Sequence, residues 1–570
     1  MVGTKTKKTV LILLFLSGAF LRLWRISDVP VSLFGDELDV GFHAYSILKT
    51  GKDYYGNPWP TQFHSIAEWR TPLYLYSVVP SVRLFGITPL GVRLPASLFG
   101  IVTLPLLYLL VKKLTNDDRV SMASVFVMTF SPWHIQYSRA GFEVAELIFL
   151  LILGLYLFLK SISSGKWLWV SVASFALMPW VYSTAKLFSP LMMFFLFLVW
   201  RREILSLPKK YLIYAVLSLI VIGFPVAYGT FFGGGTQRFN YISVFSDPTI
   251  EPEVGTARQA DARARGEMGT GLNPTVLDKV FHNKVVFWVD NIGHNYFQAL
   301  SSDFLFNEGD PNPRHSTRGI GQFYKVEVLG LVLGLSLFFA KFKDRKIKLL
   351  VIFWIMAGVF PSALTRDGGN HATRLILVLP PLVFLIAYGL SSVHEIFPKL
   401  LRFILYTIYF ILFSLSFVFY QHNYWVHNPT DSERWWHAGY QEAIQSVKAI
   451  DSSYDRVVIS SAGEPPWIFF AGWYEYPPDL WQKNFPIGND IELPGFGKVS
   501  HIDKFYFGSP SGGVYDWGKV MDKNILYLAV AREVNVNLIM EPGRTPNDLV
   551  LLKSIAYPSG EPAFYLFRGK

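Results

Sequence analysis

Two adjacent carboxylates are the strongest candidates for chemistry in this sequence. Asp36 and Glu37 lie in SLFGDELDVGFHAYSIL, about a dozen residues after the first apolar run. Adjacent carboxylates repel each other, which raises one pKa and suits that group to act as a general base. Their oxygens could equally hold a divalent cation. The plainer alternative is a helix N-terminus, where the dipole favours negative charge.

A second cluster lies in SPWHIQYSRAGFEVAEL, residues 131–147. Arg139 and Glu143 are four residues apart, so a helix would place them on one face as an ordinary salt bridge. His134 and Tyr137 lie beside them, and long apolar runs flank the stretch. Ionisable groups at membrane depth are functional candidates, so both interpretations stay open.

A third cluster is cationic and lies in FPSALTRDGGNHATRLILVLPPL, residues 360–382. Arg366, His371 and Arg374 are placed around Gly368 and Gly369, which allow a close backbone approach. The planar guanidinium of arginine suits phosphate oxygens. Snorkelling of long side chains to the membrane interface would need no ligand. We favour anion binding.

Further hydrogen-bond donors follow in the turn-rich segment FLFNEGDPNPRHSTRGIGQFY, residues 304–324. A plain loop explains this segment about as well as a binding site does. A single arginine in EWRTPLY is a weaker candidate still. The residues concerned are Arg314, His315, Arg318 and Arg70, with Glu308 and Asp310 nearby.

The elements that must position these residues are membrane-spanning helices. Of the 570 residues 51% are hydrophobic and only 16% charged, against about 25% in soluble domains. There is no cysteine, which excludes disulfides and thiolate chemistry. The fold class expected is a polytopic α-helical membrane protein with eleven spans. They cover 9–24, 92–111, 120–137, 142–159, 167–184, 187–200, 211–232, 325–340, 349–364, 375–392 and 403–420.

Basic residues lie in alternate connections between these spans, beginning with Lys5, Lys7 and Lys8. The positive-inside rule then places the N-terminus in the cytoplasm and the C-terminus outside a plasma membrane. Residues 1–420 would form the catalytic membrane domain, with outer loops 25–91 and 233–324. Residues 421–570 would form an extracytoplasmic α/β domain. The outer segments are mildly acidic, so the net charge of +10 does not indicate nucleic-acid binding.

Short apolar stretches in the outer loops predict helices that do not span. Residues 72–86 suit an interfacial or re-entrant helix, and residues 275–300 suit a helix lying on the membrane. In the tail, a helix at about 432–450 should precede strands at DRVVISS and near 525–531, 549–556 and 563–568.

These motifs together resemble the GT-C class of glycosyltransferases. The resemblance rests on GDE, PLYLY, RLFG, GVRLPASLFG, SPWHIQYSR and PSALTRDGGNHATRL, in that order. It is nearest to the protein O-mannosyltransferase, aminoarabinose transferase and RgtA/B/C/D-like branch, and covers about residues 9–420. Each motif is short, and nothing specific is recognised in the tail.

The resemblance implies an inverting enzyme with a polyprenyl-phosphate-linked monosaccharide as donor. Asp36, with Glu37 beside it, would be the general base. Many relatives have Asp shortly after the third-span arginine, whereas this chain has Gly141 and then Glu143. The donor-phosphate residues expected are Arg139, Glu143, Arg366, His371, Arg374, Arg314, His315, Arg70 and Tyr137. No cofactor is implied with certainty, and a divalent metal ion is the one candidate.

Two other classes of function remain open. A transporter or flippase of lipid-linked sugars would place charged pairs near the bilayer midplane and show matching halves. A non-catalytic glycan-binding or assembly protein would concentrate its distinctive residues in the tail, where PPWIFFAGWYEYPPDLW is rich in aromatics. The expected partners are the lipid-linked donor, membrane lipid and an extracytoplasmic acceptor.

Overall fold

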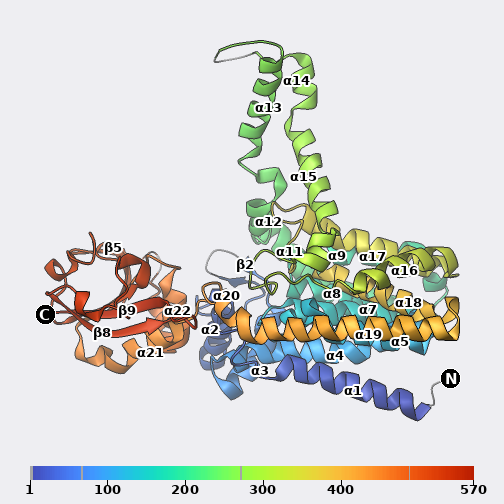
Figure 1. The fold of residues 1–570 in the computed structure, drawn as a ribbon, viewed down its shortest axis with the longest axis horizontal. Coiled ribbons are helices and arrows are strands. Elements are labelled where there is room, and N and C mark those ends of the chain that lie inside the picture. Colours follow the sequence, from blue (N-terminus) through green and yellow to red (C-terminus); the bar gives the residue numbers. More distant parts are fainter. Residues whose placement is uncertain (1–3, 66–68, 270–272, 487, 489) are drawn as a thin grey trace.

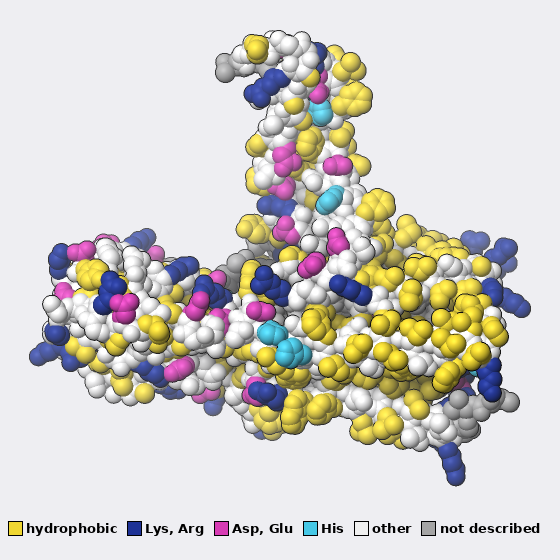
Figure 2. Space-filling model, viewed as in Figure 1, with side chains coloured by type: hydrophobic (Ala, Val, Ile, Leu, Met, Phe, Trp, Pro, Cys, Tyr) yellow, Lys and Arg dark blue, Asp and Glu magenta, His cyan; other side chains and the backbone are white. Residues whose placement is uncertain are grey.

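The computed structural model describes all residues except 1–3, 66–68, 270–272, 487 and 489. A body of long helices carries the N-terminus at one end and a sheet domain, with the C-terminus, at the other (Figure 1). We call the end of the helical body that faces the sheet domain the domain end. Hydrophobic side chains cover the visible flank of the body, and Lys and Arg gather at the end away from the sheet domain (Figure 2). This surface is typical of a membrane protein.

The helical body is built from helices that overlap every predicted span. They are α1 (Thr4–Leu23), α4 (Pro89–Thr115), α5 (Asp118–Phe130), α6 (Pro132–Arg139), α7 (Val144–Ser164), α8 (Leu168–Val181), α9 (Ala185–Val199), α11 (Lys209–Phe232), α16 (Glu327–Lys341), α17 (Arg345–Ala363), α18 (Leu379–Ile396) and α19 (Lys399–His422). Among the described residues six helical stretches are long and apolar enough to cross a bilayer. They are Pro89–Thr115, Val144–Ser164, Lys209–Phe232, Arg345–Ala363, Ile376–Ile396 and Lys399–Asp431. The number of eleven spans therefore stays a prediction.

The stretch expected as one span at 120–137 is two helices. α5 ends at Phe130, and Ser131 caps α6 by accepting a hydrogen bond from the backbone N–H of His134. Arg139 is the last residue of α6, whereas Glu143 is the N-cap of α7. The two residues therefore do not share a helix face, and the salt bridge considered from their spacing is wrong.

Two short helices precede α4 at the domain end. α2 (Gly35–Thr50) carries the predicted catalytic carboxylates, and α3 (Leu73–Phe85) covers the predicted non-spanning segment. The strands β1 (Phe63–His64) and β2 (Trp69–Arg70) form a small antiparallel ladder between these helices. The ladder places Arg70 close to the start of α2.

The long segment after α11 forms a helical arm. It contains α12 (Gln237–Ile242), α13 (Ile250–Ala264), α14 (Val276–Phe281) and α15 (Lys284–Gln298). The predicted helix at 275–300 is interrupted at His282, and Asn283 caps α15. α13 to α15 project sideways from the body, across the direction of the long helices (Figure 1). A short π-helix, Asp303–Asn307, then leads into the turn-rich loop before α16.

The sheet domain has seven strands in the order β4-β5-β6-β3-β7-β9-β8. The central strand β3 is parallel to β6 and β7, and the other pairs are antiparallel. The predicted strands correspond to β3 (Arg456–Ile459), β7 (Ile525–Val530), β8 (Leu549–Ala556) and β9 (Pro562–Gly569). The sequence did not indicate β4 (Asp490–Leu493), β5 (Gly497–Ile502) or β6 (Phe505–Phe507).

The sheet domain and the loop helices share one hydrophobic core. Short α20 (Asn428–Asp431) leads from α19 into the domain, whose helices are α21 (Tyr440–Ile450), α22 (Pro466–Tyr474) and α23 (Pro478–Lys483). One buried cluster unites Leu38 and Phe42 of α2 with Trp467 of α22 and Trp481 of α23. Gln482 also donates to Asp53 O at 2.8 Å. The sheet domain thus forms the support on which α2 rests.

Glycines set the close crossing of α16 and α18. A Cβ added at Gly389 would lie 2.0 Å from Gly330 O, and one at Gly334 would lie 1.9 Å from Leu385 O. Backbone atoms cannot move aside as a flexible side chain can. Small residues allow such close helix contacts in membranes, where apolar burial alone gives no preference for protein over lipid.

Gly389→Val should therefore separate α16 from α18 and lower the Tm in detergent, with an overpacking cost of about 1–3 kcal/mol or more. Gly223→Val is the matched control in α11, because its added Cβ would meet only the end of Leu219, at 3.5 Å. Thermal unfolding of both variants tests this, and equal Tm values would contradict the proposed contact.

Candidate functional site

Asp36 is the open carboxylate at the domain end. It lies in the first turn of α2, and its side chain is 52% exposed while most of the helix around it is buried. Arg70 Nη2 lies 2.6 Å from Asp36 Oδ1. Desolvation would raise the pKa of Asp36, but the charges of Arg70, Arg314 and Arg238 outweigh it and lower this pKa. The free protein therefore holds an ionised, accessible carboxylate among cations.

Glu37 has a different role from the one its position beside Asp36 suggested. It is fully buried and receives Arg93 Nε at 2.8 Å and Arg93 Nη2 at 2.9 Å. The backbone N–H of Gly141 also donates to it at 2.7 Å. Both oxygens are thus engaged in structural contacts, which do not support the predicted catalytic role. Arg93, in the motif GVRLP, was not singled out from the sequence.

Arg70 links Asp36 to a second acidic group on α2. Its Nε lies 3.3 Å from Asp39 Oδ2, and Asp39 also accepts hydrogen bonds from Tyr54 at 2.5 Å and Ser65 at 2.9 Å. Burial raises the pKa of Asp39 to about 6 despite these contacts. Arg70 was the weakest of the candidates predicted from the sequence, and the structure places it in direct contact with the candidate base.

Arg314 is the next cation, and it lies beside the loop that leads into α2. Its guanidinium lies 4.7 Å from the ring centroid of Phe34 and 5.9 Å from that of Trp435. Its Nε is buried and has no hydrogen-bond partner among the described residues. Burial lowers the pKa of Arg314, and the charge of Asp36 opposes this effect. The arrangement leaves a donor available for an anionic ligand.

Arg374 and Arg238 extend this group of cations. Arg374 donates to Thr365 Oγ1 at 2.7 Å, and burial, with a contribution from Arg238, lowers its pKa. Arg238, on α12, also influences the titration of Asp36, Glu143 and His371. No motif pointed to Arg238, because it lies in a polar loop stretch without a recognisable pattern. We call Arg70, Arg238, Arg314 and Arg374 the basic group.

Two of the predicted phosphate-binding arginines lie outside the basic group. Arg139 is fully buried and donates to three backbone carbonyls, Leu21 O and Val29 O at 2.9 Å and Arg25 O at 3.3 Å, and to Tyr424 Oη. Its donors therefore hold the chain after α1. Arg366 donates to Tyr241 O at 2.7 Å and anchors α12. These contacts do not support a donor-binding role for Arg139. Arg366 keeps a buried Nε without a hydrogen-bond partner among the described residues, so its role in binding the donor stays a prediction.

Glu143 and Tyr137 lie at the edge of the site. Glu143 lines a small pocket together with Arg70 and Arg238. Tyr137 is buried, and its hydroxyl lies 3.0 Å from His315 Nδ1 and 2.7 Å from Thr373 Oγ1. Tyr137 therefore orients His315 and does not itself reach the open part of the site.

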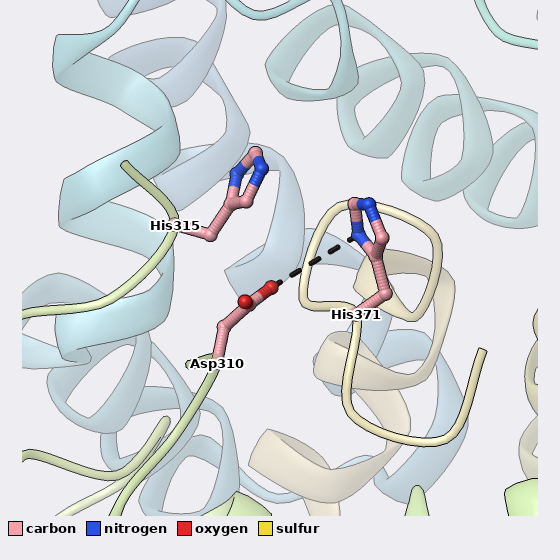
Figure 3. A group of neighbouring side chains, drawn as sticks. All are labelled: Asp310, His315 and His371. Carbon is pink, nitrogen blue, oxygen red and sulfur yellow. Dashed lines mark ion pairs between the residues drawn. The ribbon is translucent and has the colours of Figure 1, made fainter. Parts of the chain in front are cut away.

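Asp310, His315 and His371 form a compact group with the chemistry of a metal site (Figure 3). One ligand atom from each lies within 4.8 Å of the others. Burial lowers the pKa of His315 to about 3 and that of His371 to about 2. Imidazoles that are neutral at pH 7 suit metal ligands, and the predicted phosphate-binding role of these two histidines stays a prediction. His371 Nδ1 is buried without a hydrogen-bond partner and lies 4.0 Å from Asp310 Oδ2.

Two large cavities with different linings lie next to the candidate site. An apolar groove of about 910 Å³ lies between α8, α9 and α11. Lys186 lines it and donates at 3.1 Å to Gly235 O, three residues before Arg238. A polar cleft of about 1000 Å³ lies between the loop 303–319 and the start of the sheet domain. Four carboxylates and an aromatic ring are in its lining: Asp303, Glu308, Asp310, Asp431 and Trp435.

Comparison with known proteins gives matches in the helical body. A family profile described as dolichyl-phosphate-mannose-protein mannosyltransferase matches residues 70–228. The putative mannosyltransferase YkcB of Bacillus subtilis is 27% identical over 169 residues, 29% of this chain and 22% of YkcB. Dolichyl-phosphooligosaccharide-protein glycotransferase 2 of Pyrococcus horikoshii is 32% identical over 146 residues, 23% of this chain and 19% of that protein. The chain thus spans about a fifth of the length of these curated relatives.

Among solved structures, ArnT from Cupriavidus metallidurans bound to undecaprenyl phosphate is similar over 97% of both chains. The TM-score is 0.42 and the sequence identity is 11%, so this likeness carries no argument about chemistry. The family profile covers the stretch in which GVRLPASLFG and SPWHIQYSR occur. The profile and the two relatives confirm the resemblance of this chain to the GT-C class of glycosyltransferases.

Proposed function

We propose that the protein is an inverting glycosyltransferase of the plasma membrane. It transfers a monosaccharide from a polyprenyl-phosphate donor to an acceptor on the extracytoplasmic side, where the domain end and the sheet domain lie. The observation that carries the proposal is Asp36, an accessible carboxylate in contact with Arg70 and under the influence of Arg238 and Arg314. A base surrounded by phosphate-binding groups suits this reaction.

The donor would lie across the boundary between the apolar groove and the basic group. A polyprenyl chain is apolar and fits the groove between α8, α9 and α11. Its phosphate would then lie near Lys186 and Arg238, and the sugar would lie toward Asp36. The matched family and the Pyrococcus relative both carry dolichyl phosphate in their names, which supports a polyprenyl carrier.

The acceptor would enter through the polar cleft. Trp435 lines this cleft and also contacts Arg314, which lies against the ring of Phe34 just before α2. A hydroxyl-bearing lipid, glycan or protein suits a cleft lined by carboxylates and aromatic rings better than it suits the apolar groove.

The reaction would be a direct displacement at the anomeric carbon. The acceptor oxygen attacks this carbon from the face opposite the phosphate, and Asp36 takes the acceptor proton. The bond between the anomeric carbon and the phosphate oxygen breaks, and its electron pair leaves with the polyprenyl phosphate. The basic group stabilises the negative charge that develops on the leaving phosphate.

Asp36→Asn removes the base while leaving a side chain of the same shape. We expect kcat to fall by about 10²- to 10⁴-fold, while donor binding is retained. Release of polyprenyl phosphate from a radiolabelled lipid-linked sugar measures turnover, and a filter-binding assay measures the donor. Asp28→Asn is the control, because Asp28 is exposed and, among the described residues, its carboxylate forms an ion pair with Arg25 alone. Turnover near the wild-type rate in Asp36→Asn would contradict the assignment.

The pH dependence should differ between free and donor-bound enzyme. The cations lower the pKa of Asp36 in the free protein. A bound phosphate offsets their charge, so the pKa of Asp36 should rise in the complex. The acid limb of kcat should therefore lie at higher pH than the acid limb of kcat/KM for the donor. Coincident limbs in the two pH profiles would show that the phosphate does not lie near Asp36.

A divalent metal ion would bind at Asp310, His315 and His371. Two neutral imidazoles and one carboxylate are a common ligand set for zinc, and the unpartnered Nδ1 of His371 fits this interpretation. When bound, such an ion would supply Lewis acidity and would order the loops that carry Arg314 and Arg374.

Removing the ligands should remove the metal. We expect the purified protein to bind one zinc ion, and His371→Ala and His315→Ala to lose it, as measured by elemental analysis after dialysis. His501→Ala is the control in the sheet domain, away from the group. Equal zinc content in all four proteins would refute the site.

A further inference from the structure

The segment that joins α19 to the sheet domain lies directly against the loop that leads into α2. Trp436 is fully buried, and its ring lies 5.3 Å from that of Phe34 and 5.4 Å from the guanidinium of Arg93. The next residue, His437, accepts a hydrogen bond at Nδ1 from the backbone N–H of Gly35, with a distance of 3.3 Å. Gly35 immediately precedes Asp36.

This hydrogen bond satisfies a group that the helix itself cannot satisfy. The first N–H groups of a helix have no partner within the helix and normally bond to the side chain of the N-cap residue. Phe34 is the N-cap of α2 and makes no such bond. His437 provides an acceptor at this end of α2 from 402 residues away in the chain.

The backbone around His437 is shaped to present the ring. His437 has φ 51° and Gly439 has φ 88°, both in the left-handed region. Histidine adopts this region at a cost, and such conformations persist where surrounding contacts demand them. The ring of His437 packs edge-on against Phe469 of α22, at 5.0 Å between centroids. Its Nε2 lies 3.8 Å from Glu464 Oε1.

The ring is held in the protonation state that an acceptor requires. Burial and the charge of Arg314 lower the pKa of His437 to about 4, against the opposing influence of Asp36. The imidazole is therefore neutral near pH 7, with Nδ1 free to accept and the proton on Nε2, facing Glu464.

The sheet domain supports the same helix along its length. Gly472 of α22 lies so close to α2 that an added Cβ would be 2.8 Å from Leu38. The cap at Gly35 is therefore one end of a continuous contact between α2 and the sheet domain. Motion of the first turn of α2 would move the Asp36 side chain, because Asp36 lies in that turn.

We propose that His437 is a positioning residue that caps α2 and thereby holds the Asp36 carboxylate against Arg70 and toward the acceptor. The sheet domain then takes part in catalysis by orienting the base. This inference rests on the proposed function of Asp36 and goes beyond it, because it assigns a role to a residue outside the membrane domain.

The test compares three substitutions at this position. Asparagine places its amide oxygen near the position of Nδ1, whereas glutamine places its oxygen near that of Nε2. We expect His437→Ala and His437→Gln to lower kcat by about 10- to 100-fold with the donor KM unchanged, as expected for a misplaced base. His437→Asn should recover most of the activity.

The pH profile separates positioning from a general loss of stability. Weaker contact with Arg70 would raise the pKa of Asp36, so the acid limb of kcat/KM for the donor should move to higher pH in the alanine and glutamine variants. The charged groups that act on Asp36 are otherwise unchanged: Arg70, Arg238, Arg314, Asp39 and Glu143. His501→Ala, on β5, is the control for loss of a histidine from the same domain.

The outcomes distinguish this inference from the proposed function. An unshifted limb in His437→Ala, or an asparagine variant as impaired as the glutamine variant, would overturn the role of His437. If the alanine variant does not fold, the comparison of asparagine with glutamine still decides. A fully active Asp36→Asn would instead overturn the proposed function itself.

Discussion

The buried contact between Arg93 and Glu37 is the constraint on which the site depends. Both side chains are completely buried, and the guanidinium also donates to Ile26 O, Pro30 O and Ser32 O. One arginine on α4 thus fixes the chain after α1, the loop before α2 and the first turn of α2. Losing one partner of such a pair costs about 3–5 kcal/mol, because the other charge is left buried. The covering ring of Trp436 ties the sheet domain to the same contact.

This constraint separates the functions of two adjacent carboxylates. Successive residues of a helix point in different directions, so the contact that buries Glu37 turns Asp36 outward. Glu37 and Arg93 provide rigidity, and Asp36 keeps an exposed side chain among cations. A related division recurs in the later loops, where Arg139 holds backbone while Arg314 and Arg366 each keep a buried Nε without a hydrogen-bond partner among the described residues.

Much of the helical architecture could be predicted from hydropathy, because the length and apolar character of each run are local features of the sequence. Asp36 could be named as a candidate base for a similar reason, since its motif and its place after the first helix are local features. The burial of Glu37 could not be predicted, because it depends on a contact with Arg93, 56 residues away. Arg238 lies in a polar stretch without a pattern. His315 and His371 were named as phosphate-binding candidates from separate loops, and only the fold shows that both lie beside Asp310. The strands β4 and β6 have only four and three residues, and β5 begins at a glycine, so periodicity gave little signal.

The core shared by α2 and the sheet domain has a consequence for biosynthesis. Gly35 and His437 meet only after 402 further residues have been made. A nascent chain that has inserted α1 and α4 therefore carries α2 with one hydrophobic face uncovered and its first turn uncapped. The surface that supports α2 is complete only once the sheet domain has folded. Until then the Asp36 carboxylate lies on a helix without its cap and without much of its packing.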